Sequence, residues 1–299
     1  MINRIIDAHC LVGRDYWLSI NKPHLSHENL LSFYEKDIRS VSKLYKAAIM
    51  PFPSSSDGSY VEENELILSL SRKKPWTIPV LAFNPKSDAN YNYVRRQLDS
   101  GTVGALVIWP ILCNLDLINL IDNHYFRNIA ENYSCCITVH VGAGNEQRIG
   151  RVESLLRYDP DSAVLLAASY PNTCFNLSHL LRISERALHA VEQLSNVIID
   201  TSGISAHGRW YEAGSNVFPA EDCIKLRDCK PEAVIKTLMD NPLLADKLAF
   251  GTQYPFGMWY RFGLKEEVEL LMKAGLDELQ LDKLFYCNFN RFMGDELKW

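Results

Sequence analysis

The hydrophobic positions of this chain form short apolar runs that alternate with longer stretches in which apolar residues recur every three or four positions. Runs of the first kind predict buried strands, and spacing of the second kind predicts helices with one buried face. The run at 103–109 is apolar on both faces, as in a parallel sheet covered by helices. The predicted strands are 5–8, 45–50, 78–83, 103–109, 136–141, 174–177, 197–200 and 248–251.

Helices are predicted at 26–41, 62–72, 91–99, 126–133, 162–168, 185–194, 231–238, 265–274 and 277–286. Ser26 and Pro231 stand at two of the expected starts, where their residue types are favoured. Strand–helix units repeated in this way predict an α/β fold, a single-domain (β/α)8 TIM barrel over residues 1–299. An open doubly wound sheet would show the same alternation, but no glycine-rich turn follows the first strand, as dinucleotide binding there requires.

The composition and net charge of the chain argue against several classes of function. The 299 residues are 47% hydrophobic and 22% charged, which is ordinary for a globular protein, and the net charge of −5 argues against nucleic-acid binding. No apolar run approaches the roughly 20 residues of a membrane span, so we expect no membrane association. The first residues lack a secretory signal pattern, which predicts a cytoplasmic protein. The eight cysteines include no CxxC pair, which argues against a cysteine-rich zinc module, and Cys135, Cys136 and Cys174 are expected to be small core residues.

Chemically capable residues recur where the predicted strands end, which is the face on which such barrels carry their active sites. His9 follows the first strand, His140 the fifth, His179 the sixth, Asp200 the seventh and Gln253 the eighth. A single histidine in such a place is more often a structural residue than a ligand. Three of them at one face predict a shared site, and imidazoles suit a metal such as zinc.

Six segments, in order along nearly the whole chain, resemble the amidohydrolase-related family (amidohydrolase family 2), which comprises metal-dependent hydrolases and decarboxylases. The opening Ile-Ile-Asp-Ala-His-Cys-Leu is similar to the family's first-strand motif, and Phe-Gly-Thr-Gln-Tyr-Pro-Phe-Gly to its eighth-strand motif. The resemblance implies a barrel fold and hydrolysis of a small molecule, such as a cyclic ester or amide. The matching segments are 5–11, 138–142, 176–180, 196–203, 250–257 and 288–292.

The same segments depart from the family pattern at the metal site. Leu11 replaces the second histidine of the opening motif, and Gln253 replaces the aspartate that in the family binds metal and moves the proton of the attacking water. No lysine ends the fourth strand to bridge two metals. Leucine cannot ligate a metal, and a glutamine amide cannot accept a proton at neutral pH. We therefore expect a degenerate metal centre and an altered mechanism.

Three interpretations remain open. In the first, His9, His140 and His179 hold one zinc ion, which would lower the pKa of a bound water towards about 7, and the base is His207 or, as a second choice, Asp200. In the second, the hydrolase works without metal, as the resemblance allows for some lactone-cleaving members. In the third, the barrel is catalytically silent and binds a ligand or a partner protein.

Further polar and aromatic residues occur in the predicted loops at the same face, where substrate is usually recognised. Arg148, His207, Arg209 and Trp210 are the candidates for binding a small-molecule substrate, and the arginines would suit a carboxylate or a phosphate. Trp210 and its neighbour Tyr211 could equally pack internally or join copies in a homo-oligomer.

Two residues of the opening motif are expected to have supporting roles. Cys10 should point away from His9 in a strand and is predicted to be structural. Asp7 is predicted to orient its neighbours rather than to react.

Overall fold

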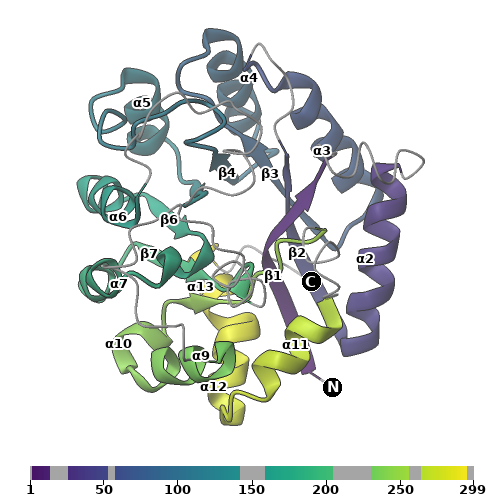
Figure 1. The fold of residues 1–299 in the computed structure, drawn as a ribbon. Helices are drawn as coiled ribbons and strands as arrows, with labels where there is room; N and C mark the ends of the chain where they lie inside the picture. Colours follow the sequence, from purple (N-terminus) through teal and green to yellow (C-terminus); the bar gives the residue numbers. More distant parts are fainter. Residues whose placement is uncertain are drawn as a thin grey trace, which may run out of the picture.

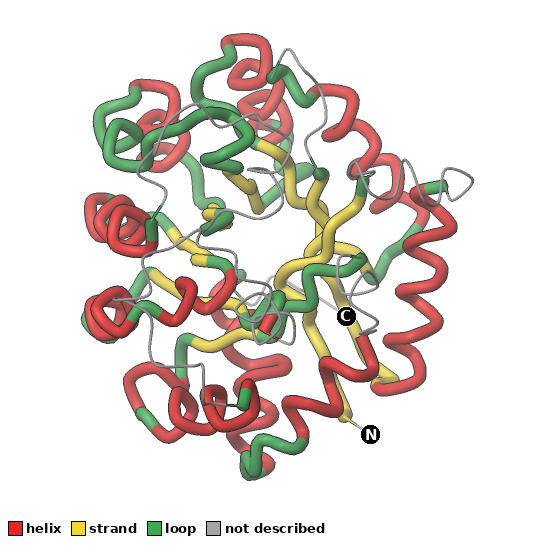
Figure 2. The backbone as a smooth tube through the Cα atoms, in the orientation of Figure 1, coloured by secondary structure: helices red, strands yellow, loops and turns green. Residues whose placement is uncertain are grey.

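The computed structural model describes residues 2–13, 26–52, 58–141, 159–204, 230–255 and 264–294. In this part of the chain, eight parallel strands form one sheet in sequential order, and the helices surround it (Figures 1 and 2). The strands are β1 (Ile2–Val12), β2 (Ser42–Pro51), β3 (Thr77–Ala82), β4 (Ala105–Ile108), β5 (Cys136–Val139), β6 (Cys174–Leu177), β7 (Val197–Asp200) and β8 (Leu248–Ala249).

Hydrogen bonds between the first and last strand regions close this sheet into a barrel. The Ala8 amide donates to the Phe250 carbonyl over 2.8 Å, and the Leu11 amide donates to the Tyr254 carbonyl over 2.7 Å. The predicted (β/α)8 barrel is therefore confirmed. Because all strands run in parallel, their carboxyl ends meet at one face, where any site of this fold is expected to lie.

Most helices begin at a residue whose side chain accepts a hydrogen bond from the first turn, and the starts predicted at Ser26 and Pro231 are confirmed. The α-helices are α2 (His27–Val41), α3 (Val61–Lys73), α4 (Asp88–Asp99), α5 (His124–Asn132), α6 (Pro160–Ser169), α7 (Glu185–Val191), α9 (Pro231–Asp240), α10 (Pro242–Ala245), α11 (Leu264–Met272), α12 (Glu278–Asp282) and α13 (Asn288–Phe292). A short helical turn η2 (His179–Ile183) follows β6, and a π-helix η5 (Lys283–Cys287) joins α12 to α13. No helix in the described ranges is long and apolar enough to cross a membrane.

The first strand differs from the prediction in a way that matters for the site. β1 extends to Val12, and its pairing with β2 shifts between Asp7 and Cys10, which marks a β-bulge. Asp7 consequently contacts Tyr34 of α2, whereas His9 joins the other histidines inside the barrel. The prediction that His9 follows the strand is wrong, since the bulge turns its side chain inward from within β1.

Asn288 anchors the last helix to the last strand and provides a test of the fold. Its amide nitrogen donates to the Ala245 and Leu248 carbonyls over 2.7 and 2.8 Å, and the residue is 1% exposed. Asn288→Leu should lower the free energy of unfolding by about 2–3 kcal/mol, because two buried carbonyls lose a donor. Urea denaturation measures this difference. The exposed Asn132, replaced in the same way, should change stability by less than about 0.5 kcal/mol; equal effects would contradict the assignment.

Candidate active site

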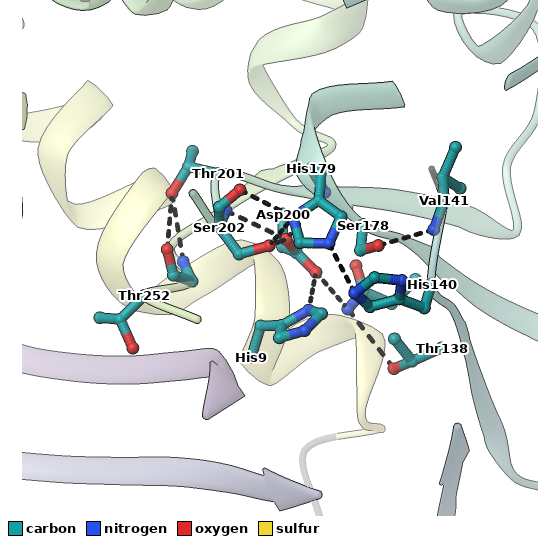
Figure 3. A network of polar contacts seen from close by, with 12 residues as sticks. His9, Thr138, His140, Val141, Ser178, His179, Asp200, Thr201, Ser202 and Thr252 are labelled. Atoms are coloured by element: carbon teal, nitrogen blue, oxygen red, sulfur yellow. Dashed lines mark hydrogen bonds and ion pairs between the residues drawn. The ribbon is translucent and has the colours of Figure 1, made fainter. Parts of the chain in front are cut away.

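Three histidines lie together at the carboxyl ends of the strands (Figure 3). His9 comes from β1, His140 directly follows β5 and His179 opens the turn after β6. One ring nitrogen of each lies within 4.8 Å of the others, and all three residues are at most 5% exposed. The tertiary structure therefore brings together the histidines that the sequence predicted to share a site.

His9 is oriented by a carboxylate. Its Nδ1 lies 3.1 Å from Oδ2 of Asp200, and both side chains are fully buried. Because an ionised carboxylate only accepts hydrogen bonds, Nδ1 carries a proton, and in the neutral ring Nε2 presents a lone pair. This Nε2 is buried and has no hydrogen-bond partner within the described residues. A buried acceptor without a partner calls for an explanation, and a ligand of the site would supply one.

His179 is oriented by a backbone carbonyl, and its tautomer fixes that of His140. The His179 Nδ1 lies 2.9 Å from the Ser202 carbonyl oxygen, which can only accept, so this nitrogen carries the proton. The opposite nitrogen, Nε2, lies 2.9 Å from Nε2 of His140. His140 must then donate this hydrogen bond. The two facing Nε2 atoms therefore share one proton, which His140 carries and His179 accepts.

Burial keeps the imidazoles of this pair uncharged. It is the largest cause that lowers the pKa of His140 well below its usual value, and the nearby Arg182 cation lowers it further. Burial is also the largest cause that lowers the pKa of His179 well below its usual value, and the Arg182 cation again adds to it. Both rings are therefore neutral at pH 7, which is the form that ligates metals.

Both carboxylate oxygens of Asp200 accept hydrogen bonds from residues of the site. Oδ2 accepts from His9 and from Nδ2 of Asn176 at 2.9 Å. Oδ1 accepts from the backbone amides of His179 and Ser202 at 3.2 and 3.1 Å, and from the Ser202 hydroxyl. Burial favours a raised pKa, but the interaction with His9 and the hydrogen bonds from Ser202 and Asn176 outweigh it and lower the pKa of Asp200. The group is an ionised carboxylate with little capacity left to accept a further proton.

Asp7 performs a similar positioning role on the outer side of β1. Its oxygens accept from the His9 amide at 2.9 Å, the Tyr34 hydroxyl at 2.9 Å, and the amide and hydroxyl of Thr252 at 3.0 and 2.5 Å. Burial raises the pKa of this carboxyl despite these donors. Asp7 thus ties the bulge of β1 to helix α2 and to the segment after β8.

The turn η2, His179–Ile183, has a left-handed backbone although it contains no glycine. All five residues of η2 have φ between 49° and 59°, a conformation that costs about 1–2 kcal/mol for each non-glycine residue. Such a turn persists only where the surroundings enforce it. Here all five side chains are buried, and Arg182 Nε donates to the Val141 carbonyl over 3.0 Å. The turn thereby places the Arg182 cation beside His140 and His179.

Gln253, which replaces the expected aspartate, lies next to the histidines. Its backbone amide donates to the His9 carbonyl over 2.7 Å. Its side-chain oxygen lies 2.7 Å from the place that a Cβ on Gly203 would occupy, and His179 Nδ1 lies 3.7 Å from that same place. Gly203, with a φ of 74°, therefore leaves room for the Gln253 amide at the edge of the site.

The remaining predicted residues divide into two groups. The substrate-binding candidates Arg148, His207, Arg209 and Trp210 lie outside the described residues. Cys10 is fully buried, and burial together with the Asp7 charge raises the pKa of its thiol well above the usual value, which agrees with a structural role. Sequence reasoning did not single out Asn176, Ser202 and Thr252, which orient the site. Each of the three lies in a segment that resembles a family motif (176–180, 196–203 and 250–257), and this position was their only signal.

Comparisons with known proteins agree with this fold. No protein-family model and no curated protein sequence match the chain. Among solved structures, an uncharacterised TIM-barrel protein from Bordetella bronchiseptica has a TM-score of 0.66 at 14% identity, with 97% of this chain and 98% of that chain covered.

Two other similar structures are named as 2-pyrone-4,6-dicarboxylic acid hydrolases. The one from Acinetobacter baumannii, with citric acid bound, has a TM-score of 0.63 at 14% identity and covers 97% of this chain and 99% of its own. The one from Pseudomonas putida has a TM-score of 0.62 at 16% identity, with 98% of each chain covered. At these identities the likeness shows that this chain shares the TIM-barrel fold of these proteins.

Proposed function

We propose that this protein is an amidohydrolase-like hydrolase that acts on a small molecule at the carboxyl face of the barrel. In this proposal His9, His140 and His179 hold one divalent cation, with zinc as the best match to three imidazoles. The observation that carries the proposal is the Nε2 atom of His9, a buried lone pair that is oriented by Asp200 and has no partner in the described part of the chain.

The chemistry of the donor set fits a metal. Histidines that bind zinc commonly donate their other ring N–H to a carboxylate or a backbone carbonyl, and His9 and His179 have these two partners. The lowered pKa values of His140 and His179 favour the neutral rings that a metal requires. Three protein ligands would leave a position for substrate or water, as in catalytic zinc sites.

The chain's own residues would then do the following. A bound zinc ion would supply Lewis acidity and activate water for hydrolysis. Asp200 holds His9 in the correct tautomer, and because its oxygens are saturated we assign it as a positioning residue rather than the base. Gln253 can bind substrate through its amide but cannot take a proton. The proton acceptor would be His207, as predicted from its place in the seventh loop.

The proposed substrate is a small molecule with a carbonyl group, such as a cyclic ester or an amide. Two structural neighbours are named as hydrolases of a pyrone dicarboxylic acid, which is a cyclic ester, and one of them holds citric acid. Arg148 and Arg209, if they line the same face, would suit such a carboxylate through paired hydrogen bonds.

A second candidate is a catalytically silent barrel that binds a ligand or a partner protein. It is favoured by Leu11, which is 3% exposed and supplies an apolar side chain where the family's opening motif has its second histidine, together with the loss of a carboxylate at Gln253. A third candidate is a hydrolase that works without a metal ion.

Metal content separates the candidates. Protein purified without chelators should carry close to one zinc ion per chain, and His140→Ala should lose it, because two neutral imidazoles bind zinc much more weakly than three. His124→Ala, which changes an exposed histidine at the start of α5, is the matched control and should keep the metal. Elemental analysis provides the measurement.

A panel of lactones and amides completes the test. The zinc-loaded protein should hydrolyse at least one of them, and the His140→Ala variant should not. Absence of zinc even after zinc is added would reject the metal-dependent proposal, and the panel would then divide a metal-free hydrolase from a silent barrel.

A further inference from the structure

Trp109 lies beside the histidines and carries a hydrogen-bonding group that no described residue engages. It directly follows β4, is 1% exposed and stacks on His140 with ring centroids 4.3 Å apart and planes at 29°. Phe52 contacts it edge-on, with centroids 5.7 Å apart. The two aromatic contacts fix the indole beside the histidines, at the end of a strand that contributes no ionisable group.

The indole nitrogen of Trp109 is buried and has no hydrogen-bond partner among the described residues. An indole N–H can only donate, and a buried one usually finds an acceptor. His140 contacts both Trp109 and His9, whose ring centroids are 4.3 and 5.8 Å from that of His140. Two polar atoms without partners among the described residues, Trp109 Nε1 and His9 Nε2, therefore belong to rings that both contact one imidazole.

We propose that the Trp109 N–H is a substrate-binding donor, which holds a carbonyl or carboxylate oxygen of the ligand over the three histidines. The inference rests on the proposed function, because it places the substrate at the same site. The ligand must present an acceptor, such as a carbonyl or carboxylate oxygen, because an indole N–H can only donate. Strand β4 thus contributes recognition rather than a metal ligand.

Nuclear magnetic resonance tests the inference without reliance on activity. The chain has six tryptophans, and the indole ¹H–¹⁵N signal of Trp109 is identified by its loss in Trp109→Phe. Acetate, acetamide and δ-valerolactone are titrated separately into metal-free and zinc-loaded protein. We expect at least one of these oxygen probes to move the Trp109 signal downfield in a saturable way. Trp76, whose indole nitrogen also has no partner but which packs between Tyr34 and Tyr45, is the internal control and should not move.

A second measurement keeps the shape of the side chain and removes only the N–H. Benzothienylalanine, incorporated at position 109, replaces the N–H with sulfur and preserves the stacking on His140. The probe that moved the Trp109 signal should bind about three- to tenfold more weakly to this variant, since one hydrogen bond is lost. The same replacement at position 76 should leave the affinity unchanged.

The outcomes are distinct. The inference would be overturned if a probe shifted the imidazole signals of His140 or His179 but left the Trp109 signal unmoved. It would also be overturned if the probe bound the sulfur analogue equally well, or if none of the three probes shifted the Trp109 signal. A Trp109 shift in a protein that takes up no zinc and hydrolyses nothing would keep the donor role and reject the hydrolase. The comparison of acetate with the two uncharged probes shows whether a carboxylate or a carbonyl is preferred.

Discussion

Replacing Asp200 with asparagine is expected to reverse the tautomer of His9 and to weaken zinc binding by about 10–100-fold. The Oδ1 position of Asp200 faces two backbone amides, from His179 and Ser202, which can only donate. The oxygen of an introduced asparagine must therefore stay there. Its NH2 group then takes the place of Oδ2 and faces His9 and Asn176.

The two groups that face the new NH2 can respond differently. Asn176 can turn its amide, because its own oxygen is buried without a partner in the described part of the chain. His9 must accept through Nδ1, so its proton moves to Nε2. The nitrogen that would face a metal then carries a hydrogen and offers no lone pair. A buried site that changes in this way should also lose about 1–3 kcal/mol of unfolding free energy.

Imidazole ¹H–¹⁵N correlation spectra report the tautomer of His9, and competition with a chelator reports zinc affinity. Asp282→Asn is the matched control, since Asp282 pairs with Arg4 at the surface with 40% of its side chain exposed. This control should leave both readings unchanged. If His9 kept its proton on Nδ1 in Asp200→Asn, or if zinc affinity stayed the same, the assigned positioning role of Asp200 would be wrong.

A methyl group added at Gly251 is expected to push His9 and Asp200 apart. A Cβ there would lie 3.1 Å from Cβ of His9, 3.2 Å from Cβ of Asp200 and 3.3 Å from Cβ of Ser202. These distances are shorter than ordinary van der Waals contact, and all three atoms are attached directly to backbone, so none can move alone. Gly251→Ala should therefore lower the unfolding free energy by about 1–3 kcal/mol through overpacking and spread His9 from Asp200.

Gly104→Ala is the matched control for this substitution. A Cβ at Gly104 would meet no atom within 4 Å, and Gly104 does not require the left-handed conformation. Its stability should change by less than about 0.5 kcal/mol. Urea denaturation and zinc competition on both variants give the comparison, and equal behaviour of the two would show that the close approach at Gly251 can be accommodated without cost.

Much of the barrel follows from local pattern. The strands at Cys174–Leu177 and Val197–Asp200 were predicted to the residue, because short apolar runs there are bounded by polar or turn-forming residues. The meeting of the three histidines was also predictable. Parallel strands of a closed barrel end at one face, so residues that follow different strands must converge there whatever their distance along the chain.

Other parts of the site carried no local signal. The bulge at His9 arises from the pairing of β1 with β2, and nothing in the opening motif distinguishes it from a regular strand. The left-handed turn after His179 uses leucine, arginine and isoleucine where glycine would have been the expected sign. Trp109 looked like the end of an apolar strand, and only its stacking on His140 shows that its ring lies beside the histidines.

Hydrophobic periodicity is a local property, and for this chain it is enough to specify the barrel and the face on which the histidines lie. The proton positions of the site histidines, in contrast, depend on contacts between distant parts of the chain. The proton of His9 is placed by Asp200, which is 191 residues away, and the tautomer of His140 depends on a carbonyl of the seventh strand's loop acting through His179. Hydrogen bonds between buried groups are decided by distances of a few tenths of an ångström, and these exist only after the strands have packed.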